Sequence, residues 1–223
     1  MPPMFHYCKG RFIPFKANDW KRKYERLIVI DDSGEIGSGS AFCVLTATVT
    51  NDVKRFERIT RAFPRYREEP KHYNSEHHEI VKVLAWAEEC DIDIYAVSYE
   101  KSKLDLETPK KKKDHNFRQT LELIELILAE DRGVAYDLMI DNTSLMEGYK
   151  EKLVDACLEI AGRCGKVIEN IEMRDSGGTK ILLVQDFIAG AVGAHIESAV
   201  DTEDPCHHRF GIIEPRVKNI IRK

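Results

Sequence analysis

Two patterns of hydrophobic positions alternate along the chain. Short runs rich in β-branched residues predict strands, and longer segments with hydrophobic residues three or four positions apart predict helices. Because strands separated by helices of this length favour a sheet covered by helices, an α/β protein is expected. The predicted strands are 27–32, 41–49, 92–99, 134–141 and 167–173, and the predicted helices begin near 53, 75, 117, 145 and 181.

Turn and capping residues place the ends of several of these elements. Three glycines within Ser33–Ser40 predict a turn that joins the first two strands as a hairpin. Asn51 and Ser75 are suitable N-caps for the first two helices. Pro64 is expected to end the first helix, and Gly165 the helix that begins near 145.

The remaining segments are expected to lie outside the packed core. The lysine-rich stretch through Lys113 is interpreted as a solvated loop, and about twenty residues at the C-terminus as a polar segment packed at the periphery. No internal repeat or long linker is visible. The chain is therefore expected to form a single domain over residues 1–223, with its core at about 27–198 and a short extension at each end.

Composition narrows the class of protein. The 223 residues are 43% hydrophobic and carry a formal charge of −4, which suits one packed domain and excludes disorder over most of the chain. The hydrophobic stretches are interrupted too often for a membrane span, and the N-terminus lacks the hydrophobic core of a secretory signal. Six scattered cysteines without a CxxC pair are interpreted as reduced thiols, so a cytoplasmic location is expected.

Two predicted strands end in the same way, with a hydrophobic run followed by an aspartate. These aspartates are Asp31 and Asp141. Ligands of α/β proteins bind at strand ends, where the backbone is rigid and side chains are partly exposed. An aspartate at a strand end more often starts a turn. Asp31 is the stronger candidate because Asp32 and Ser33 can form the turn themselves.

A third acid, Asp186, interrupts the last predicted helix. Apart from Gln185, its neighbours are hydrophobic or small, so its carboxylate is expected to point into the protein or into a cleft. A buried carboxylate requires hydrogen bonds or a metal ion. Both roles remain open: a core residue bonded to a backbone turn, and a metal ligand.

The second predicted helix begins with two more acids, Glu76 and Glu79, on roughly one face. Acids in a first helical turn also interact favourably with the helix dipole, which explains both without a site. The adjacent His77 and His78 would point about 100° apart on a helix and make a poor zinc site. The Cys-His-His run at 206–208 is a poor zinc site for the same reason.

Together these acids form a set of carboxylates on two strands and two helices. Several carboxylates brought together do not all stay ionised without a cation, and oxygen ligands select Mg²⁺ or Mn²⁺. Two such ions about 3.5–4 Å apart stabilise the attacking and leaving oxygens of phosphodiester cleavage. The members of the set are Asp31, Glu76, Asp141 and Asp186.

Motifs between residues 27 and 193 add a family resemblance. They are Val29–Gly34, Glu76–His78, Ile140–Asp141, Asp175–Ser176 and Val184–Gly190. This set resembles the domain of unknown function 3800 family, whose members typically show I-D-E-S-G, E-x-H, a strand ending in Asp, and D-S … Q-x-A-D-F-I-A-G. Two details depart from that pattern: Asp32 replaces the usual Glu, and no residue separates Gln185 from Asp186.

The resemblance implies a ribonuclease H-like fold, a mixed β-sheet flanked by α-helices, with carboxylates placed as in metal-dependent nucleases. Carried over residue by residue, it implies Asp31, Glu76, Asp141 and Asp186 as catalytic residues and as ligands of Mg²⁺ or Mn²⁺. Glu76 is preferred to Glu79 because it lies two residues before His78, as the family's Glu lies before its His.

The sequence thus favours a divalent-metal-dependent nuclease or phosphodiesterase that acts on nucleic acid and has no membrane partner. The alternatives are a non-catalytic nucleic-acid-binding or interaction module on the same fold, and a phosphoryl-transfer enzyme for small substrates. DNA or RNA as substrate, strand preference and oligomeric state stay open. With a pI near 6.1, phosphate contacts must come from local patches. The candidates, although most often such charges are solvated surface, are Lys54, Arg55, Arg58, Arg61, Arg65, Arg67 and Lys110–Lys113.

Overall fold

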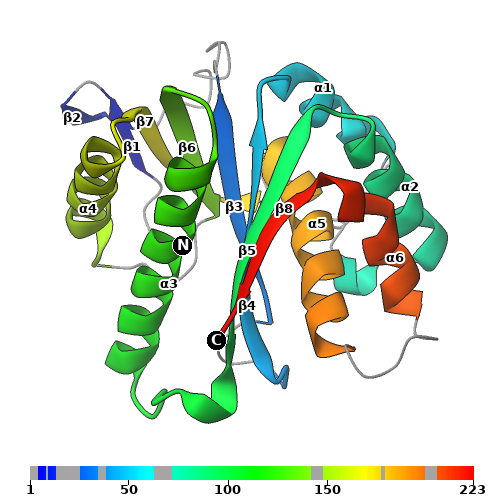
Figure 1. Ribbon diagram of the computed structural model, residues 1–223. Coiled ribbons are helices and arrows are strands. Elements are labelled where there is room, and N and C mark those ends of the chain that lie inside the picture. The colour runs from blue at the N-terminus through cyan, green and yellow to red at the C-terminus, as the bar shows by residue number, and fades with distance from the viewer. Residues whose placement is uncertain are drawn as a thin grey trace.

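An eight-stranded mixed sheet forms the centre of the protein, in the order β2-β1-β7-β6-β3-β4-β5-β8 (Figure 1). The computed structural model describes residues 5–8, 10–13, 26–34, 39–62, 72–141, 148–176, 179–198 and 205–223. The strands are β1 (Phe5–Cys8), β2 (Arg11–Ile13), β3 (Leu27–Ser33), β4 (Phe42–Thr50), β5 (Ile92–Glu100), β6 (Ala135–Asp141), β7 (Val167–Arg174) and β8 (Val217–Arg222).

The directions of the five central strands define two ends of the sheet. β4 is antiparallel to both of its neighbours, β3 and β5, whereas β6 is parallel to β3 and β7 is parallel to β6. Strands β3, β5, β6 and β7 therefore finish at the same end of the sheet, which we call its carboxyl end, opposite its amino end. This arrangement confirms the expected fold class of a mixed β-sheet flanked by α-helices.

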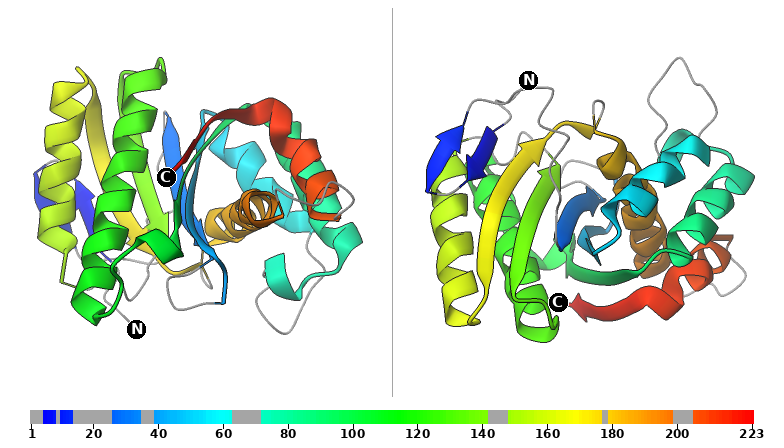
Figure 2. Two further views of the ribbon diagram at one scale, coloured as in Figure 1. Left: turned by 60° about the horizontal axis from the view of Figure 1, so that its bottom comes forward. Right: turned by 90° about the horizontal axis from the view of Figure 1, so that it is seen from above.

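Helices cover both faces of this sheet (Figure 2). One face carries α3 (Pro109–Glu130) and α4 (Lys150–Arg163), and the other carries α1 (Val53–Arg58), α2 (His77–Glu88), α5 (Lys180–Glu197) and α6 (Pro205–Ile213). Short 3-10 turns are η2 (Ile59–Ala62), η3 (His72–Asn74), η4 (Lys101–Lys103) and η7 (Glu214–Arg216).

Alternation along β3 assigns its side chains to the two helical layers. Ile28 and Ile30 pack in the layer of α3 and α4, and Leu27 and Val29 pack in the layer of α5. All four are fully buried. Because successive strand residues point to opposite faces, the next residue, Asp31, falls on the face covered by α5.

Small residues allow α5 to lie close to the carboxyl end of β3. A Cβ added to Gly193 would overlap the side chain of Ser33. Any larger residue at this position would push the helix away from the sheet. The small residues noted in the sequence of this helix therefore have a packing role that also brings Asp186 towards the strand ends.

The lysine-rich stretch expected to be a loop is helical instead. Lys110–Lys113 belong to the first turns of α3, a helix of 22 residues. The Thr108 side chain accepts a hydrogen bond from the N–H of Lys111 at 3.2 Å, and Pro109 occupies the first turn. A threonine cap followed by proline is a strong helix start, and it outweighs the repulsion among the lysines.

Both ends of the chain contribute strands that the hydrophobic pattern did not predict. The C-terminal segment, expected to pack at the periphery, forms α6 and then β8, which pairs in parallel with β5. Near the N-terminus, β1 and β2 form a hairpin, and β1 extends the sheet beyond β7. These are short strands at or near the sheet edges, where polar residues are tolerated and the periodic signal is weak.

Several helix boundaries in the structure differ from those predicted from the sequence. α1 is capped by Asp52, whose carboxylate accepts from the N–H of Arg55 at 3.0 Å, whereas Asn51 accepts from Arg26 at 2.9 Å. α1 ends at Arg58 and continues as the 3-10 turn η2. α2 is capped by Glu76 rather than Ser75. α4 begins at Lys150, and the predicted start near 145 falls outside the described residues.

Two general expectations can be compared with the described residues. No helix among them is both long and apolar enough to cross a membrane. The cysteines that the structure describes form no disulfide with one another; they are Cys8, Cys43, Cys90, Cys157 and Cys164.

Candidate functional site

Asp31 and Asp141 come together because β3 and β6 are parallel neighbours. The two strands are in register at Ile30 and Ile140, so each aspartate is the next residue on its strand at the carboxyl end of the sheet. Asp141 is in turn opposite Arg174 on β7. Helix α5 packs on β3 and brings Asp186 to the same region.

Asp31 is the centre of this group. It is only 5% exposed, and its Oδ1 accepts the backbone N–H of Asp32 at 2.8 Å. Its Oδ2 is buried and has no hydrogen-bond partner among the described residues. Burial, and then the charges of Asp141, Asp32 and Asp186, raise the pKa of Asp31 well above its usual value. The three other aspartates therefore lie within electrostatic range of Asp31.

The other two predicted aspartates, Asp186 and Asp141, each accept a hydrogen bond from a backbone N–H. Asp186 is half-buried, and its Oδ2 accepts the N–H of His72 at 2.7 Å. Asp141 Oδ1 accepts the N–H of Ser176 at 3.1 Å. A hydrogen bond of this kind fixes the direction of a carboxylate.

A small cavity of about 10 Å³ lies at these strand ends. Asp31, Asp32 and Asp141 line it from the sheet, and Asn116 and Thr120 line it from α3. Its size suits about one water molecule. Ile30, Leu45 and Ile140 complete its lining, so polar and apolar residues share the wall.

Sequence reasoning missed Asn116 as part of this cavity. It is 5% exposed and lies four residues before Thr120, which is 2% exposed, on the buried face of α3. The signal available in the sequence was a pair of polar residues on the same helical face as Leu123 and Ile127. The position of two polar residues on an apolar helix face predicts that they are buried, but it does not predict which strand ends they face.

Glu76 is not brought together with the other three acids. It is the N-cap of α2, and its side chain is 77% exposed and lies 3.2 Å from His78 Nδ1. Glu79 accepts the backbone N–H of Glu76 at 3.0 Å. The charges that raise the pKa of Asp31 are those of the aspartates Asp141, Asp32 and Asp186. The observed contacts are those of a helix start, and ligation by Glu76 stays a prediction.

Carboxylate oxygens are suitable ligands for a divalent cation, but those that the structure describes are not arranged around a single metal position. The acids offer only oxygen ligands, and the unsatisfied Oδ2 of Asp31 would gain most from a cation. Within the described part of the chain, however, no three His, Cys, Asp or Glu side chains are placed to hold a metal ion. Binding would therefore require the side chains to draw together or a further donor to join them.

The two groups of basic residues lie at opposite ends of the sheet. α1, with Arg55 and Arg58, follows Thr50, which pairs with Leu27 at the amino end. Lys110–Lys113 are at the start of α3, the helix whose Asn116 reaches the acidic cavity. The lysines are thus nearer to the acids. Of the other arginines considered, the side chain of Arg61 and all of Arg65 and Arg67 fall outside the described residues.

Comparisons with known proteins give a distant likeness to a solved structure. No family model and no curated protein sequence matches the chain, so these comparisons assign it to no family, and the resemblance to the 3800 family rests on the sequence motifs alone. The chain is similar to one in the structure of the PCNA:RNase HII complex from Archaeoglobus fulgidus, with 13% identity and a TM-score of 0.45. The match covers 86% of this chain and 91% of that one. A likeness this distant assigns no activity.

Proposed function

We propose that this protein is a nuclease or related phosphodiesterase that depends on Mg²⁺ or Mn²⁺. The observation that supports this proposal best is Asp31, a buried carboxylate with one unsatisfied oxygen beside other acids. A protein gains nothing in stability from such a cluster, because like charges repel and burial disfavours ionisation. Clusters of perturbed carboxylates at strand ends are instead typical of functional sites.

Each acid has a distinct part in this proposal. Asp31 and Asp141, on neighbouring strands, provide the rigid side of the centre, and Asp186 closes it from α5. Glu76, at the start of α2, is proposed as the fourth ligand, reaching the centre from the helix cap. When bound, divalent ions would supply the Lewis acidity that activates water and stabilises the leaving oxygen in phosphodiester hydrolysis.

The substrate proposed is nucleic acid, with Lys110–Lys113 as phosphate contacts. These lysines begin the helix that also lines the acidic cavity, so a bound backbone could reach both. Lys111 is partly neutralised, because its ammonium lies 3.7 Å from Glu107 and also pairs with Asp105. Phosphate contacts of this kind position a strand without reading its sequence.

A second candidate function is a non-catalytic nucleic-acid-binding module on the same fold. Two observations favour it: the described acids do not converge as a closed metal site, and Glu76 is exposed at a helix cap. In that case the cluster would bind no metal ion and the lysines alone would account for binding.

The test combines metal binding with cleavage. Calorimetry with Mn²⁺ should give saturable binding that Asp31→Asn abolishes, and labelled single- and double-stranded DNA, RNA and hybrid should be cleaved only with the divalent ion. Asp93→Asn is the matched control, because Asp93 is an ion-paired aspartate at the amino end of the sheet. Saturable Mn²⁺ binding with no cleavage of any substrate would favour the small-substrate enzyme, and no Mn²⁺ binding would favour the binding module.

A further inference from the structure

A second cavity, of about 300 Å³, opens at the amino end of the sheet. It lies between α1 and η2 on one side and the last turn of α2 on the other. The acidic centre is at the opposite, carboxyl end, because α1 follows the end of β4 that pairs with the start of β3. The residues that line the cavity are Arg55, Arg58, Ile59, Trp86, Glu89 and Cys90.

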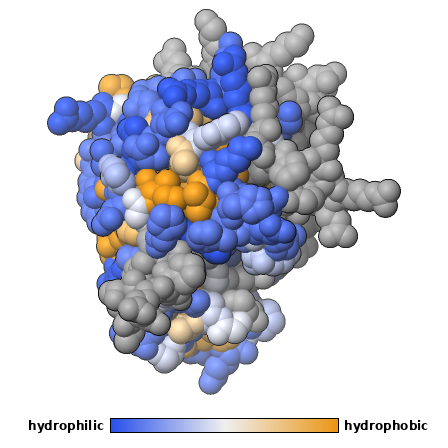
Figure 3. Space-filling model, turned by 90° about the vertical axis from the view of Figure 1, so that its right-hand side faces the viewer, coloured by the Kyte–Doolittle hydropathy of each residue, from blue (hydrophilic) through white to orange (hydrophobic). Residues whose placement is uncertain are grey.

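The floor of this cavity is apolar, and one wall is an accessible indole. Ile59 and Cys90 are almost fully buried, whereas Trp86 is 39% exposed. Figure 3 shows the face of the molecule that lies on the right-hand side of Figure 1, where a small hydrophobic area is set among hydrophilic side chains. A partly exposed indole offers a surface on which a planar ring can stack.

The charges around this indole are mostly positive. Arg58 is exposed and forms no ion pair within the described residues. Arg55 lies 3.6 Å from Glu89, but both side chains are more than half exposed, so this pair is weak. The ammonium of Lys82 lies 5.4 Å from the centre of the Trp86 ring. Among the residues that line the cavity, two arginines therefore accompany one carboxylate.

We propose that this cavity binds a nucleotide, with the base stacked on Trp86 and the phosphate held by Arg58. A guanidinium pairs with phosphate through two parallel N–H donors, and Arg55 can add a second contact when it leaves Glu89. The volume is at the lower limit of small-ligand pockets, which run from about 300 to 1,000 Å³. The nucleotide can be free or part of a single strand, because both present the same base and phosphate.

Fluorescence of Trp86 provides the test. The protein has two tryptophans, so Trp20→Phe leaves Trp86 as the sole indole. In that background, AMP should quench the fluorescence saturably, and adenosine and inorganic phosphate should each bind at least about tenfold more weakly. Arg58→Met should weaken AMP binding by about tenfold or more, because a charged hydrogen-bond donor is lost. Arg132→Met, at an exposed arginine elsewhere, should leave it unchanged.

Further variants separate this site from the acidic centre and from misfolding. Asp31→Asn should bind AMP like the parent, even if it abolishes metal-dependent cleavage, so failure of one site does not imply failure of the other. Circular dichroism of each variant checks that it is folded, and Arg58→Lys, which keeps the charge, should retain part of the affinity. A short single-stranded oligonucleotide that binds more tightly than AMP would identify the occupant as a strand, and equal affinity would identify a free nucleotide.

The proposal is overturned by any of three results. These are the absence of saturable quenching by AMP and by the oligonucleotide, equal affinity for adenosine and AMP, and unchanged AMP affinity in folded Arg58→Met. Equal affinity for adenosine and AMP would show that the cavity binds the base without the phosphate. Unchanged AMP affinity in Arg58→Met would show that Arg58 does not bind the phosphate.

Discussion

The backbone N–H of His72 donates a 2.7 Å hydrogen bond to Oδ2 of Asp186. The two residues are 114 positions apart in the chain, and the contact joins the 3-10 turn before α2 to α5. The imidazole of His72 lies against Gly190, one turn further along α5, and edge-on to Phe187 with the ring centres 6.3 Å apart. Ring packing thus fixes the backbone that orients the carboxylate.

Gly190 is the residue that makes this contact possible. A Cβ at Gly190 would overlap the His72 ring, so Gly190→Ala should displace the 3-10 turn and destabilise the protein by about 1–3 kcal/mol. The loss of a fixed Asp186 should also weaken Mn²⁺ affinity in calorimetry. Gly162→Ala on α4 is the control, because nothing lies within 4 Å of its added Cβ. It should stabilise by up to about 1 kcal/mol in urea denaturation. Equal stability of the two variants would contradict the packing argument.

Asp31 should limit the stability of the metal-free protein. Asp31→Asn removes a charge that is buried beside other acids, so the variant should unfold at higher urea concentration, by about 0.5–2 kcal/mol. Mg²⁺ should raise the melting temperature of the wild type by mass action, and that of the variant much less. A variant that is strongly destabilised without metal would instead identify Asp31 as a structural hydrogen-bonding residue.

The choice between Glu76 and Glu79 remains a prediction to be tested by cleavage. We expect Glu76→Gln to abolish metal-dependent cleavage and Glu79→Gln to keep most of it. Glu79 accepts the N–H of Glu76 at 3.0 Å, so its replacement should cost only about 0.5–1 kcal/mol through the helix start. The reverse activity pattern would place the ligand one helical turn later. No effect from either substitution would leave three acids and favour the non-catalytic module.

The central fold was accessible from sequence because its signals are local. Hydrophobic runs predicted β3 and β6 and the position of an aspartate near the end of each. That the two strands are parallel neighbours, which brings Asp31 and Asp141 together, is a result of the structure. The involvement of Asn116 was not accessible, because it depends on how α3 packs across the strand ends. The same holds for the cavity beside Trp86, which two helices form only after folding. Periodicity predicts which face is buried, but not which residues of separate elements meet.

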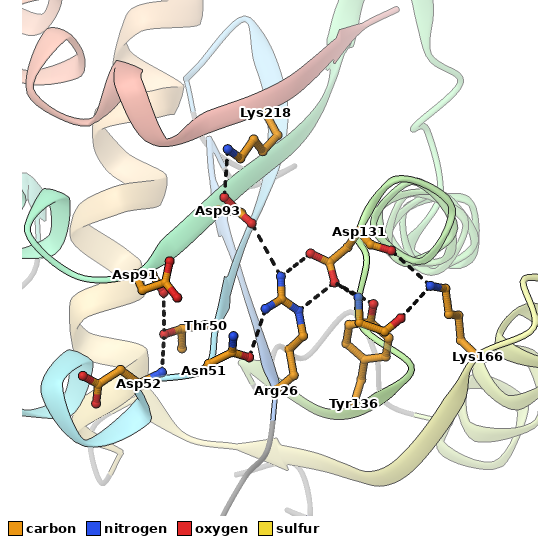
Figure 4. A network of polar contacts seen from close by, with 11 residues as sticks. Arg26, Thr50, Asn51, Asp52, Asp91, Asp93, Asp131, Tyr136, Lys166 and Lys218 are labelled. Carbon is orange, nitrogen blue, oxygen red and sulfur yellow. Dashed lines mark hydrogen bonds and ion pairs between the residues drawn. The ribbon is translucent and has the colours of Figure 1, made fainter.

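A polar network at the amino end of the sheet contrasts with the acidic centre, because here the carboxylate is satisfied (Figure 4). Asp131, at the end of α3, accepts hydrogen bonds from Arg26 Nε at 2.7 Å, from the Tyr136 hydroxyl at 2.6 Å and from the N–H of Gly133 at 2.9 Å. Arg26 also lies 3.5 Å from Asp93 on β5. The network therefore ties the segment before β3 to both α3 and β5.

Asp131 should make stability depend on acid pH. Burial alone would raise its pKa, but hydrogen bonds from Arg26, Tyr136 and Gly133 outweigh burial and hold the pKa below the ordinary 3.8. The unfolded chain then takes up the proton first as the pH falls, so this stabilisation is complete above about pH 5 and is lost below about pH 4. Asp131→Asn should cost about 1.5–3 kcal/mol at pH 7.

The measurement is urea denaturation of the wild type and Asp131→Asn at several pH values. The difference in free energy of unfolding should narrow as the pH falls below about 4, because the wild-type carboxylate becomes protonated. Glu159→Gln is the control: Glu159 forms an exposed ion pair with Arg163 at 2.9 Å, and its loss should cost no more than about 0.5 kcal/mol at any pH. A difference between wild type and Asp131→Asn that is the same at pH 3 and pH 7 would show that Asp131 acts through shape and packing, and not through its charge.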